Sequence, residues 1–414
     1  MMQTSTIIVI ALLLIVVLNV LTIVATLAAK ALRSRKGEQE KQIRDLIEPA
    51  LYEYLVLGEV SPILRQAKTK NPDILSAMIV KLMTALRGAE YEKMVSLAKD
   101  LGLAKRDFQR LRSQRRWQRA QAVENLGYYG GDQRTAPLSE LLDDEDETVR
   151  AVAARALSRI GTREAAVALS RRLVSPSELT SLRMAENLER IGPLAVEPLL
   201  ELIEREEDEA RRAQVLAARI LGNLRVYEAR PALGRTIVQR WNTSLRAQAA
   251  LSLGKIGDPE DVPVLLEAAQ DDSWPVRSQA ANALEMIGDT SAIPTLESLV
   301  EDREWWVRLN ASRALVNMGA EGEKALTRVL EAPDRYARDR AAAVMENRGI
   351  TRRMVTEMAG SDERAEGARN VVQKLIRNGT TRHLEYLART LPKGDEQREL
   401  RELLAAERAE SDES

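Results

Sequence analysis

The sequence contains no cysteine, and phenylalanine and histidine each occur once in 414 residues. A chain without cysteine has no disulfide, no thiolate metal site and no cysteine nucleophile. A catalytic triad or a histidine-based metal site would have to use the single histidine, His383. The sequence also lacks a phosphate-binding glycine loop, a dinucleotide fingerprint and the ligand spacing of a calcium loop. We therefore predict no catalytic residue, no metal and no cofactor, and a protein that is not an enzyme.

Aromatic residues make up only 3% of the chain, whereas charged residues make up 30%. Alanine, leucine, arginine and glutamate dominate, and strand signals are nearly absent. This balance is typical of many thin amphipathic helices stacked in a row, because one compact core normally uses more large rings. We expect an all-α protein.

Residues 7–29 form the longest apolar run and contain no charged side chain. As a helix this run would span about 34 Å, enough to cross a bilayer. Basic residues follow the run directly and none precedes it, so residues 1–6 should lie outside and the rest of the chain in the cytoplasm. The small residues near its end leave signal-peptide cleavage open. We predict a single-pass protein of the cytoplasmic membrane, with Asn19 either tolerated within the span or mediating self-association through it.

Glycine recurs every 30 to 35 residues over the rest of the chain, a period that predicts a solenoid of about nine two-helix repeats over residues 113–391. Apolar residues one and four positions before most of these glycines form a helical stripe, and each glycine is suited to end the helix. The glycines are Gly127, Gly161, Gly192, Gly222, Gly257, Gly288, Gly319, Gly349 and Gly379. Residues 30–112 then form a basic juxtamembrane helical region and N-terminal cap, and residues 392–414 an acidic C-terminal tail, a frayed helix or disordered.

Arginine stands eleven residues before the glycine in seven of the nine copies, and in three copies an aspartate precedes that arginine by six residues. This spacing predicts a ladder of charge-assisted hydrogen bonds between successive repeats, which we interpret as structural rather than as an anion-binding row. The predicted ladder residues are Arg150, Arg211, Arg246, Arg277, Arg308 and Arg338, with Arg116 at the start, and Asp144, Asp271 and Asp302.

The arginine, alanine and glycine positions resemble the HEAT repeat, most closely the short bacterial type named after phycobilisome lyases. The segments that carry the resemblance run from Val149 to Leu157 and from Val276 to Gly288. With the apolar segment, the chain resembles a membrane-anchored member of this group. The resemblance implies an α-solenoid behind an N-terminal transmembrane helix, in the inner membrane of a bacterium. It is unspecific for function, because such arrays serve many roles.

Two groups of residues are candidates for partner binding. A dense basic cluster includes Arg106, Arg110, Arg112 and Arg115, and could contact an acidic partner, a membrane surface or nucleic acid, or simply be solvated or paired within the protein. Trp274 and Trp305 occupy the same place in consecutive repeats and Trp306 follows at once, so these rings either seal the joint between repeats or anchor a partner.

The leading functional hypothesis is a membrane-tethered scaffold that binds partner proteins in the cytoplasm. The resemblance implies companions in membrane systems of bacteria, among them envelope polysaccharide machinery. The alternatives are a phycobilin-lyase-like enzyme or chaperone, and a HEAT-like protein that binds nucleic acid. Nucleic acid is disfavoured because the chain is near neutral overall, with a net charge of −1.

Overall fold

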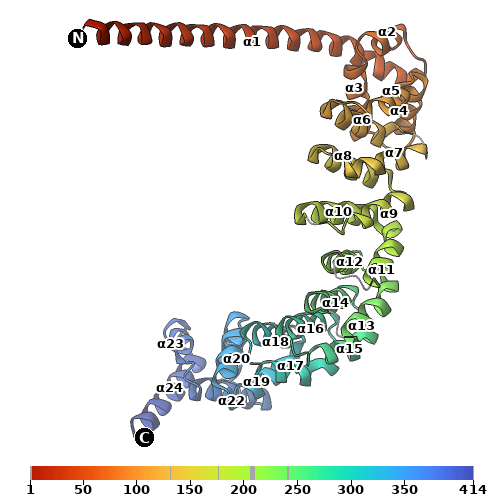
Figure 1. Cartoon of the computed structure of the whole chain (residues 1–414). Helices are drawn as coiled ribbons and strands as arrows, with labels where there is room; N and C mark the ends of the chain where they lie inside the picture. Colours follow the sequence, from red (N-terminus) through yellow and green to blue (C-terminus); the bar gives the residue numbers. More distant parts are fainter. Residues whose placement is uncertain (1, 131, 176, 206–209, 240–241, 414) are drawn as a thin grey trace. The chain divides into compact units, whose positions relative to one another are not determined.

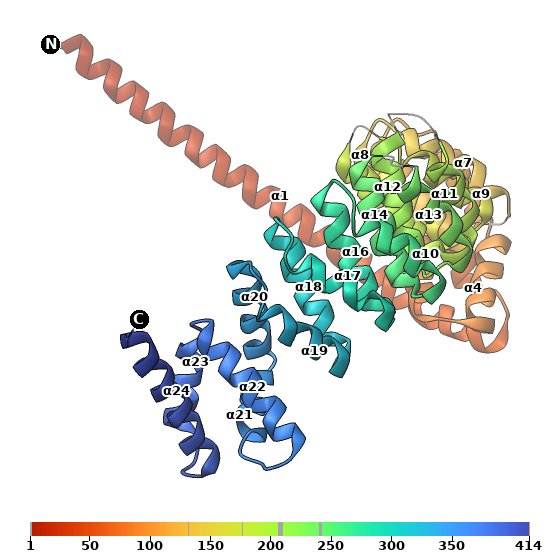
Figure 2. The same cartoon turned by 90° about the horizontal axis from the view of Figure 1, so that it is seen from below.

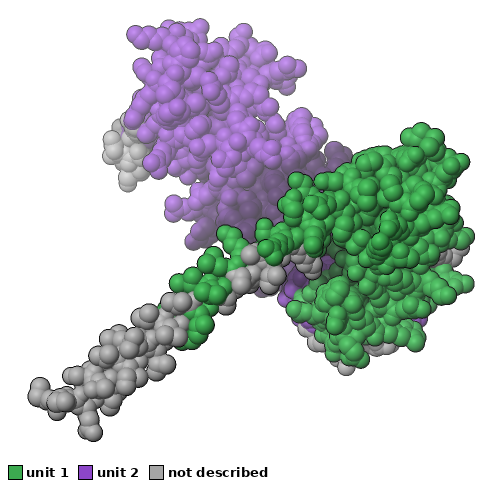
Figure 3. All heavy atoms as spheres, turned by 90° about the horizontal axis from the view of Figure 1, so that it is seen from above, with its two compact units in different colours: residues 1–165 green, residues 166–414 purple. Residues whose placement is uncertain are grey.

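The computed structural model describes residues 2–130, 132–175, 177–205, 210–239 and 242–413, apart from some side chains, mostly near the two ends of the chain. Helices follow one another along the whole of this described part, and it contains no β-strand. The chain divides into two compact units, Met1–Ala165 and Ala166–Ser414 (Figure 3). The prediction of an all-α solenoid is confirmed.

The first unit begins with a bundle of helices that precedes the repeats. Its buried residues include Leu51, Leu64, Ile79, Met94 and Leu97, which come from four different helices and form one apolar core. Ser61 caps α2 by accepting a hydrogen bond from the Leu64 amide. The helices are α1 (Met2–Leu57), α2 (Pro62–Lys70), α3 (Pro72–Ala85), α4 (Gly88–Asp100) and α5 (Leu103–Arg110).

Helical hairpins follow in both units, and the first helices of consecutive hairpins pack against one another (Figures 1 and 2). The first unit contains α6 (Arg116–Tyr129), α7 (Thr135–Glu140) and α8 (Glu147–Ile160), and α9 (Arg163–Arg171) lies across the division. The second unit contains α10 (Glu178–Ile191), α11 (Val196–Ile203), α12 (Arg211–Asn223), α13 (Arg230–Val238), α14 (Thr243–Ile256), α15 (Val262–Ala268), α16 (Trp274–Ile287), α17 (Ile293–Leu299), α18 (Trp305–Asn317), α19 (Gly319–Val329), α20 (Arg335–Asn347), α21 (Ile350–Glu357), α22 (Glu363–Arg377), α23 (Thr381–Thr390) and α24 (Asp395–Glu413).

Small side chains let the first helices approach closely. In α16 the alanines Ala280, Ala281 and Ala283 are fully buried beside Leu284, and Gly288 ends the helix with a φ of 76°. A left-handed φ favours glycine because it has no Cβ. Seven of the nine predicted glycines have a positive φ.

Gly127 and Gly222 do not end helices, so the predicted role is wrong at these two positions. They lie inside α6 and α12, where a Cβ would be 2.8 Å from the Ala156 Cβ and 2.5 Å from the Ser252 Oγ. Both glycines therefore allow close contact between neighbouring first helices. After α12 the left-handed residue is Arg225, with a φ of 52°, three residues beyond Gly222.

The predicted tail, residues 392–414, contains α24, which packs against α21, α22 and α23. Leu400 and Leu404 are buried there, and Gln397 donates hydrogen bonds to the Ala388 and Leu391 carbonyls. This segment differs from a free tail because its two leucines, four residues apart, lie on one face of the helix.

The predicted transmembrane helix, residues 7–29, is not supported. Within the part of the chain that the structure describes, no helix has both the length and the apolar character that a bilayer crossing requires. Many side chains of residues 1–29 lie outside that part. This finding contradicts the predicted localisation, which was a single-pass inner-membrane protein with its N-terminus outside and its repeats in the cytoplasm. Self-association through such a span has no support either.

Candidate functional site

Charge-assisted hydrogen bonds join successive hairpins of the second unit. The Nε and Nη2 atoms of Arg277 lie 2.7 and 2.9 Å from the two carboxylate oxygens of Asp302, and its Nη1 donates to the Asp271 carbonyl at 2.8 Å. Arg246 binds the Asp271 carboxylate in the same way, at 2.9 Å for both contacts. The carboxylate of each aspartate thus accepts hydrogen bonds from the arginine of the preceding repeat. Its backbone carbonyl accepts a hydrogen bond from the arginine of its own repeat.

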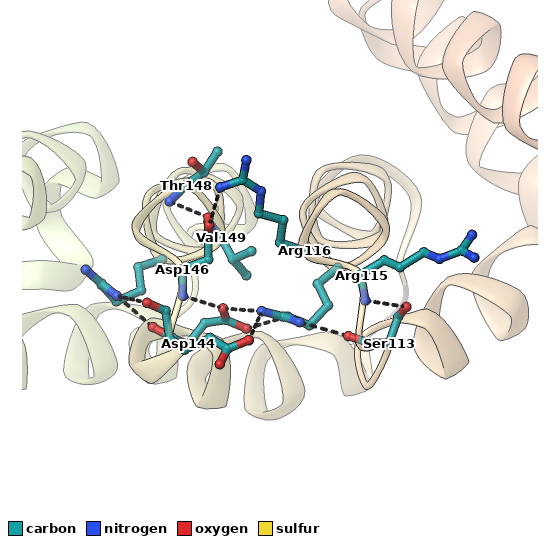
Figure 4. A network of polar contacts seen from close by, with 10 residues as sticks. Ser113, Arg115, Arg116, Asp144, Asp146, Thr148 and Val149 are labelled. Atoms are coloured by element: carbon teal, nitrogen blue, oxygen red, sulfur yellow. Dashed lines mark hydrogen bonds and ion pairs between the residues drawn. The ribbon is translucent and has the colours of Figure 1, made fainter.

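The first unit contains an equivalent rung, but its arginine is Arg119 rather than the predicted Arg116. The Arg119 guanidinium donates to both Asp144 oxygens, at 2.7 and 2.8 Å, while Arg150 donates to the Asp144 carbonyl. Figure 4 shows Asp144 within this network and Arg116 reaching Asp146 instead. Arg119 precedes its aspartate by 25 residues, as Arg246 and Arg277 precede theirs. The error follows from Gly127, which lies three residues before the helix C-cap at Gly130.

The same displacement of three residues affects Arg211. It is exposed at the start of α12, and Gln214, only 3% exposed, occupies the ladder position eleven residues before Arg225. The Gln214 amide donates to the Ile203 carbonyl at 3.1 Å. An uncharged amide replaces the guanidinium here.

Electrostatics favour the charged form of both partners of the Arg277–Asp302 rung. The hydrogen bonds that Arg277 donates to Asp302 raise the pKa of Arg277 above its usual range. Burial alone would raise the pKa of Asp302, but the hydrogen bonds from Arg277 and from the Glu304 amide outweigh it and lower that pKa below its ordinary value. Both side chains are only 9% exposed, so the ion pair is largely shielded from water.

A second joint links the outer helices, and sequence reasoning missed it. Arg230, at the start of α13, contacts Asp258 at 2.6 Å, Asp261 at 2.8 Å and Glu260 at 3.2 Å. The hydrogen bond to Asp261 is the main cause of a raised Arg230 pKa. The three acidic residues stand in the turn that precedes α15, about one repeat further on, so only the repeat register could have indicated them.

The predicted basic cluster is largely paired within the protein. Arg106 and Arg110 both bind Asp73 in α3, which lies more than 30 residues away in the sequence. Arg112 and Arg115 are exposed, and among the described residues no carboxylate lies within ion-pair distance of either guanidinium. Arg112 and Lys105 line an open cavity of about 810 Å³ whose floor contains Phe108 and Leu111. Of the four arginines predicted as a binding cluster, Arg112 and Arg115 are therefore the two that stay exposed.

Asp107, in the middle of the basic cluster, is fully buried. Its Oδ2 accepts hydrogen bonds from the Tyr129 hydroxyl at 2.5 Å and the Asn125 amide at 3.0 Å. Burial raises the pKa of Asp107 despite these bonds. The carboxylate therefore reduces stability at neutral pH, because the folded state favours the protonated form more than the unfolded state does.

We predict that Asp107→Asn raises the free energy of unfolding at pH 7 by about 1 kcal/mol, because the amide keeps an acceptor without a buried charge. The gain should shrink as the pH falls below the raised pKa, where Asp107 is protonated in the folded state. Denaturant unfolding of both proteins between pH 4 and 8 measures this. A loss of stability at pH 7 would contradict the prediction.

The predicted tryptophans lie at the N-terminal ends of neighbouring first helices. Trp274 begins α16, and Trp305 and Trp306 begin α18, with exposed fractions of 40, 45 and 53%. Tyr336, near the start of α20, is 69% exposed. We call these four residues the aromatic row. The rings of Trp305 and Trp306 are 4.6 Å apart and nearly perpendicular.

Within the described residues, there is no group of three or more His, Cys, Asp or Glu side chains that could hold a metal ion. His383 lies beside Glu346, with its Nδ1 3.1 Å from a carboxylate oxygen.

Stacked helical hairpins joined by arginine–aspartate rungs define an α-solenoid of short repeats. The sequence profile described as HEAT repeats matches residues 108–189, 196–285 and 262–346, so the chain belongs to the HEAT-repeat family. Comparison with curated protein sequences gave no match.

Several solved structures are similar to this chain. A Kap121p mutant has 13% identity and a TM-score of 0.52, and Kap121p bound to the extreme C-terminus of the protein phosphatase Cdc14p has 14% and 0.50. Each match covers 86% of this chain, which spans only 45% of those karyopherins. The complex of CpcE and CpcF of phycocyanin lyase from Nostoc sp. PCC7120 has 19% identity and a TM-score of 0.28, and covers 59% of this chain and 94% of that one. The two karyopherin likenesses show the fold alone.

Proposed function

We propose that this HEAT-repeat solenoid is a non-enzymatic scaffold that binds protein partners through the aromatic row. The observation that carries the proposal is four large exposed rings at the same end of three adjacent helices, α16, α18 and α20. Tryptophan and tyrosine are enriched at binding hot spots, and a chain with so few aromatic residues places four of them together.

The ladder supports this role because it fixes the helices that carry the row. The rungs at Asp271 and Asp302 hold the turns that lead directly into α16 and α18. A surface that is already ordered loses little conformational entropy on binding, which favours affinity. Kap121p, which shares the fold, binds the SUMO protease Ulp1p and the Cdc14p C-terminus, and this supports protein segments as the class of partner.

Removing the central rings tests the proposal. We expect Trp305→Ala with Trp306→Ala to lower affinity for a captured partner at least about tenfold, since hot-spot tryptophans contribute about 2 kcal/mol or more. Affinity capture with the full chain, followed by titration of the recovered protein, provides the measurement.

Trp117→Ala is the matched control, because Trp117 is 54% exposed and lies in the other unit. It should leave the captured proteins unchanged. Circular dichroism should show the same helix content in all three proteins. If the double variant retains every partner with unchanged affinity, the aromatic row is not the binding surface.

A further inference from the structure

The arginines of the ladder continue for one repeat further along the chain than its aspartates do. Arg308 donates from Nη1 to the Asp302 carbonyl at 2.7 Å, as Arg277 does to the Asp271 carbonyl. The register that pairs Arg277 with Asp302 would pair Arg308 with residue 332 or 333, which are alanine and proline. Within the described residues, no carboxylate lies within ion-pair distance of Arg308. We call this position the open rung.

The turn at the open rung keeps the geometry of the complete rungs. Arg338 donates to the Ala332 and Pro333 carbonyls at 2.8 and 2.9 Å, as Arg277 donates to the Asp271 and Asp272 carbonyls. Ala332 therefore stands where Asp271 and Asp302 stand in the preceding repeats. A single side chain, rather than a change of backbone, leaves Arg308 without its carboxylate.

Arg340 adds a second positive charge beside Arg308. Burial lowers the pKa of Arg340, and the nearby Arg308 lowers it further, so the two cations disfavour one another. The acidic side chains around the turn are engaged elsewhere: Asp334 caps α20, Asp339 lies 3.6 Å from Arg335 and Glu331 lies 2.9 Å from Lys374. An added carboxylate would relieve this repulsion.

Aromatic rings border both arginines. The Arg308 guanidinium lies 5.6 Å from the centre of the Tyr336 ring, and the Arg340 guanidinium lies 5.0 Å from that of Trp305. The three helices are in contact. Because axes of packed helices are usually about 8–10 Å apart, the aromatic row extends over roughly 20 Å, the length of about six extended residues. The cations thus lie within the surface that the rings form.

We propose that the open rung binds a side-chain carboxylate of an extended, acidic partner segment whose apolar side chains pack on the aromatic row. This inference rests on the proposed function and adds the chemistry of the partner. Arginine suits the role because its planar fork can donate two parallel hydrogen bonds to one carboxylate, as Arg277 does to Asp302. The expected pattern of the segment is a glutamate or aspartate with apolar residues two positions away, because residues two apart lie on the same face of an extended chain.

A fluorescein-labelled octapeptide Ser-Leu-Ser-Leu-Ser-Glu-Ser-Leu, with an amidated C-terminus, tests the proposal against the same peptide with Gln for Glu, because its Leu and Glu side chains share one face of the extended chain. We expect the protein to bind the Glu peptide at least about tenfold more tightly in fluorescence anisotropy, since hydrogen bonds to charged groups are stronger than those to neutral groups. Higher salt should reduce this preference. The free-acid form of the Gln peptide shows whether a terminal carboxylate can replace the side chain.

Two variants locate the preference at the open rung. Arg308→Gln removes the positive charge and the guanidinium fork. Ala332→Asp supplies an internal carboxylate, for which the Asp334 amide is placed as the Glu304 amide is for Asp302. Both should abolish the preference for Glu over Gln, and Ala332→Asp should also raise the melting temperature. Arg328→Gln is the control, because Arg328 in α19 is exposed and pairs with Glu297.

Equal binding of the two peptides by the wild type, or a preference that survives in both variants, would overturn the proposal. If the capture of partners still depended on Trp305 and Trp306 in that case, the proposed function would remain supported. The failures of the two proposals are therefore distinguishable.

Discussion

Replacing Gly254 by leucine should lower the melting temperature of the second unit by about 6–12 °C. A Cβ at Gly254 would lie 2.5 Å from the Ala283 Cα and 2.7 Å from its Cβ. The nearest obstructing atom belongs to the backbone of α16, so α14 and α16 must move apart. Overpacking of this kind costs about 3 kcal/mol, and each kcal/mol shifts the melting temperature of a unit this size by about 2–4 °C.

Gly234→Ala is the matched control for this experiment. Gly234 lies inside α13 with an ordinary φ, and no atom lies within 4 Å of the position its Cβ would take. Alanine there should stabilise the protein by about 0.5–1 kcal/mol, because it restricts the unfolded chain and favours the helix. Differential scanning calorimetry of both variants provides the comparison. Equal melting temperatures for Gly254→Leu and the wild type would show that the helices are not in tight contact there.

The period of the repeat could be predicted from the sequence, but the role of each glycine could not. Glycine suits both a left-handed helix end and a close helix contact, because both require the absence of a Cβ. Gly161 and Gly288 serve the first purpose, whereas Gly127 and Gly222 serve the second. The two uses lie three residues apart in the repeat. Counting back from the wrong kind of glycine therefore predicted Arg116 and Arg211 as ladder residues, where the structure has Arg119 and Gln214.

The partners of the basic cluster could not be predicted for a different reason. Arg106 and Arg110 bind Asp73 in α3, and Arg119 binds Asp144 in the turn before α8. The two pairs with Asp73 depend on how the non-repeating helices pack at the start of the solenoid, and no local pattern specifies that packing. The Arg119–Asp144 pair follows the 25-residue spacing of the ladder and was missed only through the register. The repeat register placed the tryptophans at the joint between repeats, and the structure has them at the start of the helices that follow the joint.

Replacing Asp302 by alanine should lower the free energy of unfolding by about 3–5 kcal/mol, since it leaves the buried Arg277 guanidinium without its carboxylate. Arg277 would retain only the carbonyls of Asp271 and Asp272. The double variant Arg277→Met with Asp302→Leu should be considerably more stable than Asp302→Ala, because it removes both charges together. Urea unfolding of the wild type and both variants measures this difference.

The contribution of Asp302 should also depend on pH, with a sign opposite to that of Asp107. The pKa of Asp302 is lower in the folded state than its ordinary value, so the folded form binds fewer protons. The stabilisation is fully present above the unfolded pKa of about 3.9 and is lost as the pH falls through the folded pKa. The stability difference between the wild type and Asp302→Asn should therefore stay constant from pH 7 to 5 and shrink below about pH 4. A difference that grows on acidification would mean that the ion pair does not hold the rung.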